Sequence, residues 1–284
     1  MNDYPKSGKW GAKKWILLVI LPLITGLLLS LFIPKPVIGT IYLSDAIYGS
    51  TAQDMITQIS YARENANVRA VVIVINSPGG TVTDTESVYM ELARLREKKP
   101  VIMMVEGMAA SGAYYLASCT DYIMAKPSSL VGNIGVIGDL PPSPVVYEQT
   151  YSTGPYKMWG SPQETFVREM EMLKQGFLKA VLLGRGSALK IGPEIILRGE
   201  IWPGTEAYRM GLIDEIGPQS KAFEKAAQIA KITNYEIEDL RTLAGIPSVV
   251  FNPFFIQTKE GVNTAYPREA GLYYLFIPPV EELQ

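Results

Sequence analysis

Short apolar runs and helical segments alternate along the chain between residues 37 and 125. Four apolar runs predict strands, namely Val37–Leu43 (VIGTIYL), residues 70–75 (AVVIVI), residues 101–105 and Tyr122–Ala125. Helical patterns fill the intervals, at residues 52–64, 83–95 and 111–118. Strands that alternate with helices at this spacing indicate βαβ units and an α/β fold with a mostly parallel sheet.

Two further features predict where helices begin and end. Thr83 with Glu86 has the spacing of a capping box at the start of the second helix. Ser161 with Glu164 has the same spacing, and Pro162 would take the first helical position of a long helix. We expect that helix to end at residues 184–186, and a later helix to cover residues 222–232.

Two loops that follow predicted strands carry residues suited to chemistry. Residues 76–80 (NSPGG) follow the second strand, and Ser111 starts a helix after the third, where negative charge is favoured. Functional loops of α/β folds lie at such carboxyl ends of strands. Acyl transfer needs a nucleophile, here Ser111, and two N–H donors for the oxyanion. Gly79 or Gly80 would supply one donor and Gly112 the other, although each motif alone also fits a plain turn or close helix packing.

The chain contains no histidine, and this limits the base that a serine nucleophile needs. A Ser-His-Asp triad is therefore excluded. The remaining common base is a lysine whose pKa is lowered by burial, because desolvation disfavours the ammonium form.

Composition excludes several other classes of protein. The 284 residues carry a formal net charge of −2, and no Lys/Arg-rich face stands out, so we expect no nucleic-acid partner. Without histidine and with only Cys119, most zinc and non-haem iron sites and all thiolate clusters are excluded. We therefore expect neither a metal nor a cofactor, and we interpret Cys119 as a small buried residue on an apolar helix.

Residues 15–33 form an almost unbroken apolar run without charge. At ~1.5 Å per residue the run is long enough to cross a hydrocarbon core of ~30 Å, and it has no polar face. The alternatives are a buried core helix and a cleaved signal peptide, but no small-residue cleavage site follows. Four lysines precede the run and only Lys35 follows closely, so the positive-inside rule predicts a cytoplasmic N-terminus and an extracytoplasmic remainder.

The order of several motifs carries a family resemblance. These motifs are residues 76–80 (NSPGG), 110–115 (ASGAYY), 132–136 (GNIGV), 199–204 (GEIWPG) and 211–217 (GLIDEIG). Together they resemble the signal peptide peptidase A family of membrane-bound serine proteases, from about residue 37 to residue 232. The resemblance implies a crotonase-like, Clp-protease-related fold of repeated β-β-α and βαβ units, preceded by one transmembrane helix, and a Ser/Lys dyad.

The resemblance also indicates which lysine serves as the base. The family's lysine lies in a Ser-Gly-x-x-Lys segment between a Gly-x-Ile-Gly-Val strand and a long helix. Residues 152–157 (STGPYK) occupy that place, although Thr153 separates the serine from the glycine. The resemblance therefore implies Lys157 as the base for Ser111, with Lys126 as the rival and a solvated surface lysine as the structural alternative.

The implied mechanism is that of a serine endopeptidase. Neutral Lys157 would remove the proton of Ser111, which attacks a peptide carbonyl, while the glycine N–H groups hold the oxyanion. Implied substrates are residual signal peptides and other membrane-derived peptides. Short family members form ring-shaped homo-oligomers in which neighbouring subunits share the dyad.

This interpretation divides the chain into four parts. Residues 1–14 are the cytoplasmic N-terminus, 15–34 the transmembrane anchor, 35–241 the Ser/Lys protease domain, and 242–284 an aromatic-rich C-terminal extension. The extension is too apolar for a disordered tail, and a neighbouring subunit is one surface on which it would pack.

Three alternatives stay open. A related membrane protease would share the mechanism but cleave intact membrane proteins, such as stomatin-like partners. A crotonase-type enzyme would act on acyl-CoA, although such enzymes are soluble and usually need a carboxylate in the site. An inactive membrane scaffold is the third, against which the presence of both Ser111 and Lys157 argues.

Overall fold

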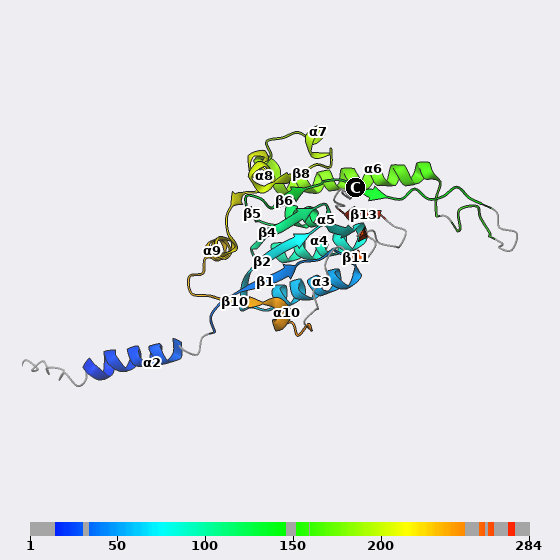
Figure 1. The fold of residues 1–284 in the computed structure, drawn as a ribbon. Helices are drawn as coiled ribbons and strands as arrows, with labels where there is room; N and C mark the ends of the chain where they lie inside the picture. The colour runs from blue at the N-terminus through cyan, green and yellow to red at the C-terminus, as the bar shows by residue number, and fades with distance from the viewer. Residues whose placement is uncertain are drawn as a thin grey trace, which may run out of the picture.

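The computed structural model describes residues 15–30, 34–145, 152–158, 160–247, 256–258, 261–263 and 272–275. An eight-stranded sheet forms the centre of this part of the chain (Figure 1). Six strands follow the spatial order β10-β1-β2-β4-β5-β9, and all their pairings are parallel. These six strands are β1 (Val37–Leu43), β2 (Val68–Ser77), β4 (Val101–Ala110), β5 (Tyr122–Ala125), β9 (Glu215–Ile216) and β10 (Glu236–Asp239).

The long strand β4 changes neighbour along its length. Its first half pairs with β5, and residues 108–110 pair in parallel with β6 (Leu130–Gly132). Strand β6 in turn pairs antiparallel with β8 (Ile201–Pro203). The segment just before Ser111 is therefore bordered by a different strand from the one that borders the rest of β4.

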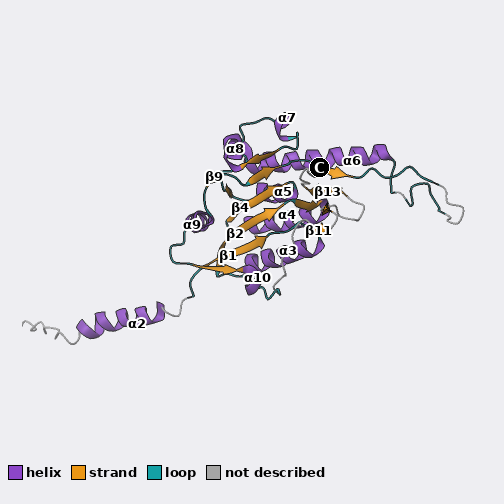
Figure 2. Cartoon of the chain, viewed as in Figure 1, coloured by secondary structure: helices purple, strands orange, loops and turns teal. Residues whose placement is uncertain are grey.

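Helices cover both faces of the sheet (Figure 2). The helices are α3 (Gly49–Glu64), α4 (Val82–Arg96), α5 (Gly112–Ser118), α6 (Gln163–Arg185), α7 (Pro193–Ile196), α8 (Gly204–Met210), α9 (Gln219–Ala230) and α10 (Leu240–Leu243). Side chains alternate along each strand, so β2 directs Val71 and Ile73 to the face that packs under α3 and α4, and Val72 and Val74 to the face under α9. Both faces of the central strands are thus buried, which explains their continuous apolar sequences.

The strands predicted from sequence are confirmed, and Tyr122–Ala125 has the predicted bounds. The predicted capping box of Thr83 and Glu86 is wrong. Helix α4 starts at Val82, and Thr81 is its N-cap, since the Thr81 side chain accepts a hydrogen bond of 3.2 Å from the Asp84 N–H. Thr81 and Asp84 have the same spacing two residues upstream, where the chain leaves β3 (Gly79–Thr81).

The predicted start of the long helix is also wrong, by one position. Pro162 is the N-cap of α6 and not its first residue, and no side chain caps that end. The end is confirmed, because Gly186 has φ 48° directly after Arg185. The later helix covers Gln219–Ala230 instead of residues 222–232, since it begins right after Pro218.

Part of the C-terminal extension joins the main domain. Strand β13 (Leu272–Leu275) lies between β3 and β7 (Ile137–Gly138) and is antiparallel to both. Strands β11 (Ile256–Thr258) and β12 (Gly261–Asn263) pair only with each other among the described residues.

The N-terminal apolar run is helical where it is described. It consists of the π-helical segment η1 (Ile16–Ile20) followed by α2 (Leu21–Ser30). Within the described residues, no helix meets the combined length and hydropathy required of a membrane span. Residues 31–33 of the predicted anchor lie outside the described part of the chain.

Candidate active site

Ser111 lies at the junction of β4 and α5 in an unusual backbone conformation. Its φ is 54° and its ψ is −120°, values that a residue with a Cβ rarely adopts. The residue is 2% exposed, and its N–H donates a hydrogen bond of 2.8 Å to the Gly132 carbonyl. Strained residues that the surrounding structure holds in place concentrate at functional sites, so this conformation singles out Ser111.

The partner of Ser111 is itself fixed by a distant part of the sequence. Gly132 has φ 118°, and a Cβ there would come within 2.7 Å of the Trp202 ring. The next residue, Asn133, donates from its backbone N–H to the Glu200 carbonyl (2.7 Å) and from Nδ2 to the Gly199 carbonyl (2.8 Å). Three sequence motifs, at residues 110–115, 132–136 and 199–204, therefore meet behind the serine.

The glycine pair after β2 is also held at close range. The Ile47 N–H donates to the Gly79 carbonyl (2.7 Å), and the Thr81 N–H donates to the Ile47 carbonyl (2.9 Å). Gly79 has φ 100°, and a Cβ on Gly80 would lie 1.8 Å from the Ile47 oxygen. Only glycine fits either position, because one needs a positive φ and the other a very close backbone approach.

The glycine pair and Ser111 lie at the same edge of the sheet. Ser77, two residues before Gly79, pairs with Ala109, two residues before Ser111. Helix α5 also contacts β3 directly. Gly112 is the first residue of α5, and N–H groups of a first helical turn have no partner within their own helix. This edge therefore combines a buried serine with the first N–H group of α5 and with the glycine pair, in which the Gly79 N–H donates to the Ser77 hydroxyl at 3.3 Å.

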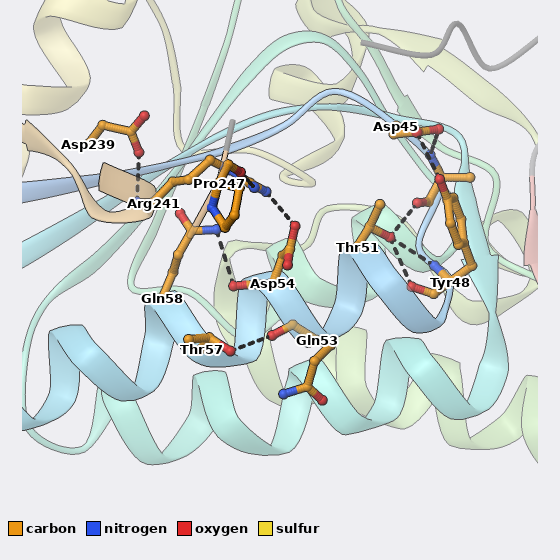
Figure 3. Close-up of polar contacts among 11 residues, drawn as sticks. Asp45, Tyr48, Thr51, Gln53, Asp54, Thr57, Gln58, Asp239, Arg241 and Pro247 are labelled. Carbon is orange, nitrogen blue, oxygen red and sulfur yellow. Dashed lines mark hydrogen bonds and ion pairs between the residues drawn. The ribbon is translucent and has the colours of Figure 1, made fainter. Parts of the chain in front are cut away.

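A polar network holds the loop that carries Ile47 (Figure 3). The Thr51 hydroxyl donates to the Ala46 carbonyl at 2.7 Å and accepts from the Tyr48 N–H at 3.0 Å. Asp45 accepts from the Ala46 N–H and from the Tyr48 hydroxyl. Sequence reasoning missed this loop, although one signal was available: it follows β1 at the same carboxyl edge as the other two loops.

Lys157 is exposed, whereas Ser111 is buried. It is exposed in a turn, where its N–H donates to the Gly154 carbonyl at 3.1 Å. The described residues 139–145 and 152–158, between β7 and α6, extend away from the sheet (Figure 1). Within the described residues, no hydrogen bond joins the Lys157 side chain to Ser111. The pairing of Ser111 with Lys157 stays a prediction.

The rival base, Lys126, has a different partner. Its ammonium group forms an ion pair with Glu106, and its side chain is 43% exposed. Its backbone N–H donates to the Ser129 hydroxyl at 3.3 Å. These contacts place Lys126 in a structural ion pair.

The closing motif at residues 211–217 anchors the helix that follows Ser111. Arg185, almost fully buried, forms two hydrogen bonds with Asp214 (2.7 and 2.9 Å) and donates to the Gly211 carbonyl (3.0 Å). The Tyr114 hydroxyl on α5 donates to the Leu212 carbonyl at 2.8 Å, and complete burial raises the pKa of this phenol. The motif therefore holds α5 through the Tyr114–Leu212 hydrogen bond and contributes no exposed reactive group.

No metal centre is found in the described part of the chain, where no group of three or more Cys, Asp or Glu residues could hold an ion. Cys119 is buried, as the sequence predicted.

The fold and this edge define the class of protein. The family profile described as Clp protease matches residues 38–130, which include the glycine pair and Ser111. The profile described as Peptidase family S49 matches residues 93–233, which include Ser111 and Lys157. The chain belongs to peptidase family S49.

Individual relatives agree with this assignment. The chain is 35% identical over 184 residues to a putative protease of Methanocaldococcus jannaschii, covering 60% of this chain and 59% of that protein. It is 32% identical over 196 residues to the chloroplastic serine protease SPPA of Arabidopsis thaliana (64% and 29% covered). It is 28% identical over 197 residues to a putative signal peptide peptidase SppA of Enterococcus faecium (64% and 57% covered). The chain thus spans less than two thirds of the length of these three relatives.

Proposed function

We propose that the chain is a serine endopeptidase in which Ser111 is the nucleophile and Lys157 the general base. The observation that carries the proposal is the strained, buried Ser111 beside the Gly79–Gly80 pair, in a chain without histidine. Family membership supports peptide hydrolysis over the crotonase-type reaction and over an inactive scaffold.

The proposed chemistry uses groups of this chain alone. The neutral amine of Lys157 accepts the proton of Ser111 Oγ while Oγ attacks a peptide carbonyl carbon. The N–H groups of Gly112 and of Gly80, or Gly79, stabilise the negative charge on the carbonyl oxygen. Lys157 then returns the proton to the departing amine, and water hydrolyses the acyl-enzyme in the same manner.

We propose that the dyad forms between neighbouring subunits of a homo-oligomer. Lys157 belongs to an arm, defined as residues 139–145, 152–158 and 160–175. Five large apolar side chains of the arm are 48–65% exposed, namely Leu140, Val145, Met158, Val167 and Met172. The first fully buried residue of α6 is Phe177, although Leu173 is half-buried against the core. A second copy that covers the arm would bury these side chains and bring Lys157 to its Ser111.

We also propose that residues 15–34 anchor the protease domain on the extracytoplasmic side of a membrane. Residues 15–28 and 30 of this run are exposed, and no residue from 15 to 30 is charged. Degradation of residual signal peptides and other membrane-derived peptides fits that location. Protease added to intact cells should digest the region beyond Lys35, and protection until lysis would contradict this topology.

Mixing two inactive variants tests the shared dyad. Ser111→Ala and Lys157→Ala should each lower peptidase kcat by at least about 10³-fold, because each removes one half of a unit. If neighbouring subunits share the dyad, mixed oligomers of the two variants regain activity at sites that combine intact Ser111 with intact Lys157.

The controls decide between the possible bases. Lys126→Ala should retain near-normal turnover. Oligomers made of Ser111→Ala alone should stay inactive. Near-normal turnover of Lys157→Ala would overturn its assignment as the base. Absence of recovery in mixed oligomers, with both single variants inactive, would place both dyad residues in one chain.

A further inference from the structure

The amino ends of the parallel strands form the edge of the sheet opposite to Ser111, and the proposed anchor enters the domain at this edge (Figure 1). Pro36 directly precedes β1. Hydrogen bonds join the segments that enter neighbouring strands. The Val37 N–H donates to the Asn67 carbonyl at 2.8 Å, and the Glu236 N–H donates to the Pro36 carbonyl at 3.0 Å. These segments therefore form one continuous surface beside the end of the anchor.

Five cations lie on this surface, which we call the basic edge: Lys35, Arg69, Lys98, Lys99 and Lys231. Lys35 follows the proposed anchor, and Arg69 is the second residue of β2. Burial, together with the neighbouring charges of Arg69 and Lys98, lowers the pKa of the Lys99 ammonium, so these three cations lie close together. Among the described residues, only Lys35 of the five forms an ion pair, with Glu236 at 3.0 Å.

The other carboxylates of this edge do not balance its cations. Glu64 forms an ion pair with Arg63 at 3.7 Å, and Asp121 forms one with Arg96 at 2.7 Å, so both are offset by cations outside the five. Glu97, at the C-cap of α4, is a further carboxylate. Against it stand the three cations of the basic edge that form neither an ion pair nor a side-chain hydrogen bond within the described residues. The basic edge is therefore positive overall.

Helix ends alone do not explain this set of cations. Cations near helix C-termini complement the helix dipole, which accounts for Lys98 and Lys99 after α4. Arg69, however, lies on a strand, and Lys35 lies in the segment before β1. Lys231 follows α9 with φ 56°, a conformation that glycine adopts at lower cost. The chain thus carries a cation where the backbone favours glycine.

A hollow of about 390 Å³ lies between the end of the anchor and the basic edge. Lys35 and Lys231 line it together with Thr233 and Asn234, and no carboxylate is among its described lining residues. Ammonium, hydroxyl and amide groups all donate hydrogen bonds to phosphate oxygens. The hollow therefore offers several donors to an anion at the level where the anchor ends.

We propose that the basic edge docks on a membrane surface rich in anionic phospholipids, whose headgroup phosphates its lysines and Arg69 bind. This inference rests on the proposed anchor, which ends at residue 34 and so holds Lys35 at the level of the headgroups. Anionic headgroups attract basic segments that lie next to a membrane-spanning helix. Docking would hold the Ser111 edge ~30 Å from the bilayer, because β4 runs ten residues from one edge to the other at ~3.3 Å each.

Fluorescent labels on the full-length chain test this orientation. In a Cys119→Ala background, Ala66→Cys places a label between α3 and β2 on the basic edge, and Thr83→Cys places one at the start of α4, on the Ser111 edge. Both positions are exposed. In vesicles of phosphatidylcholine and phosphatidylglycerol with nitroxide-labelled headgroups, the label at residue 66 should be quenched and the label at residue 83 should not. Phosphatidylcholine alone should give weak quenching at both.

Charge variants test which groups hold the edge on the lipid. Arg69→Ser/Lys98→Ser/Lys231→Ser should lower the ratio of docked to undocked domains about 100-fold and abolish quenching at residue 66. The matched control Arg69→Lys/Lys98→Arg/Lys231→Arg keeps all three charges and should keep the quenching. Both variants should retain the Ser111-dependent hydrolysis of a water-soluble peptide, because the substitutions lie at the opposite edge of the sheet.

Extraction of the vesicles with alkaline carbonate separates the docking from the anchor. If the chain stays in the membrane but the two labels are quenched equally, or the serine variant is quenched like the control, the docking surface is overturned and the anchor stands. Release of the chain by carbonate would instead overturn the anchor. In that case, quenching at residue 66 on anionic vesicles at low salt would retain the docking surface, and its absence would overturn both.

Discussion

Ser111 and Lys157 lie in regions of opposite character. Ser111 is 2% exposed, and its N–H donates to the Gly132 carbonyl, while the next residue, Asn133, donates to the carbonyls of residues 199 and 200. Lys157 lies in an exposed turn of the arm, where Met172 is 65% and Val167 54% exposed. The nucleophile is thus positioned by the core of its own subunit, whereas the arm has apolar surface that its own subunit leaves uncovered.

This difference suggests that the two catalytic groups of the proposed site are positioned in different ways. The orientation of a nucleophile must hold within fractions of an ångström, and close packing of backbone and small residues supplies that accuracy. A base delivered by a neighbour makes activity depend on assembly, so a lone subunit would be inactive. Four predictions test this division between a fixed nucleophile and an assembly-dependent base.

The largest effect is expected from Gly132→Ala, because the Gly132 carbonyl accepts the hydrogen bond of the Ser111 N–H. The new Cβ would meet the Trp202 ring at 2.7 Å at a residue with φ 118°, so the strand must shift. We expect a loss of about 2–4 kcal/mol in the free energy of unfolding and at least 100-fold in kcat. Gly135→Ala is the matched control, because nothing lies within 4 Å of its added Cβ. Equal unfolding free energies and equal kcat values for the two variants would contradict the role of Gly132 in positioning Ser111.

A smaller effect is expected from charges on the arm. Val167→Glu/Met172→Glu should leave the unfolding free energy within about 0.5 kcal/mol, because both side chains are already exposed. It should dissociate the oligomer in analytical ultracentrifugation and lower activity about 10–100-fold. Leu183→Glu, at a residue 72% exposed on the same helix but beyond Phe177, serves as the control. Full activity of the double variant as a single chain would show that the arm needs no neighbour.

The pH dependence of activity depends on the protonation of the base and not on the contacts of Ser111 with Gly132. A lysine base works only when neutral, and an unperturbed lysine has a pKa of ~10.4 that desolvation lowers. Below the apparent pKa, activity should therefore fall about tenfold per pH unit and should persist above pH 8. The residual activity of Gly132→Ala should show the same apparent pKa. A profile that peaks below pH 6 would exclude a lysine base.

The smallest effect on activity is expected at Cys119, which is buried in the same subunit core as Ser111. Burial raises the pKa of the Cys119 thiol to about 11, so the folded chain retains this proton at pH values where the unfolded chain loses it. The thiol therefore destabilises the fold progressively as the pH rises from about 9 to about 11, by at most about 3 kcal/mol. Cys119→Ala should show a shallower loss of stability over that range, with unchanged activity at pH 8.

The measurement is urea unfolding at several pH values. The buried phenols of Tyr114 and Tyr115 titrate late for the same reason, so some alkaline destabilisation should persist in the variant. An identical pH slope for the variant and the unmodified chain would show that Cys119 titrates normally in the fold.

Much of the architecture follows from patterns that a sequence displays directly. The apolar run 70–75 predicted a buried strand, and the structure extends it to Val68–Ser77 with parallel neighbours on both sides. The helix boundaries were harder, because Thr81 and Thr83 both have a carboxylate three residues later. Only the β3 pairing, which ends at Thr81, decides which threonine caps α4.

Candidate residues were also found from sequence, but their roles depend on contacts between distant segments. Ser111 was singled out by its small neighbours and by the missing histidine, whereas its positive φ and its hydrogen bond to the Gly132 carbonyl are visible only in the folded chain. The contribution of Ile47 was invisible, because a backbone carbonyl that approaches Gly80 leaves no trace in the identity of residue 47. The catalytic roles of Ser111, Lys157 and the glycines stay predictions until the variants are measured.

By itself the sequence determined the class of fold, the nucleophile candidate and the need for a base other than histidine, because periodicity and composition are local properties. The tertiary structure decided the strained conformation of Ser111 and the position of β13 beside the glycine pair. Residues 80 and 274 are far apart in the sequence, and their backbones meet only because the sheet edge offers unpaired N–H and C=O groups. Such groups are common to every residue, so their pairing is set by topology and not by amino-acid type.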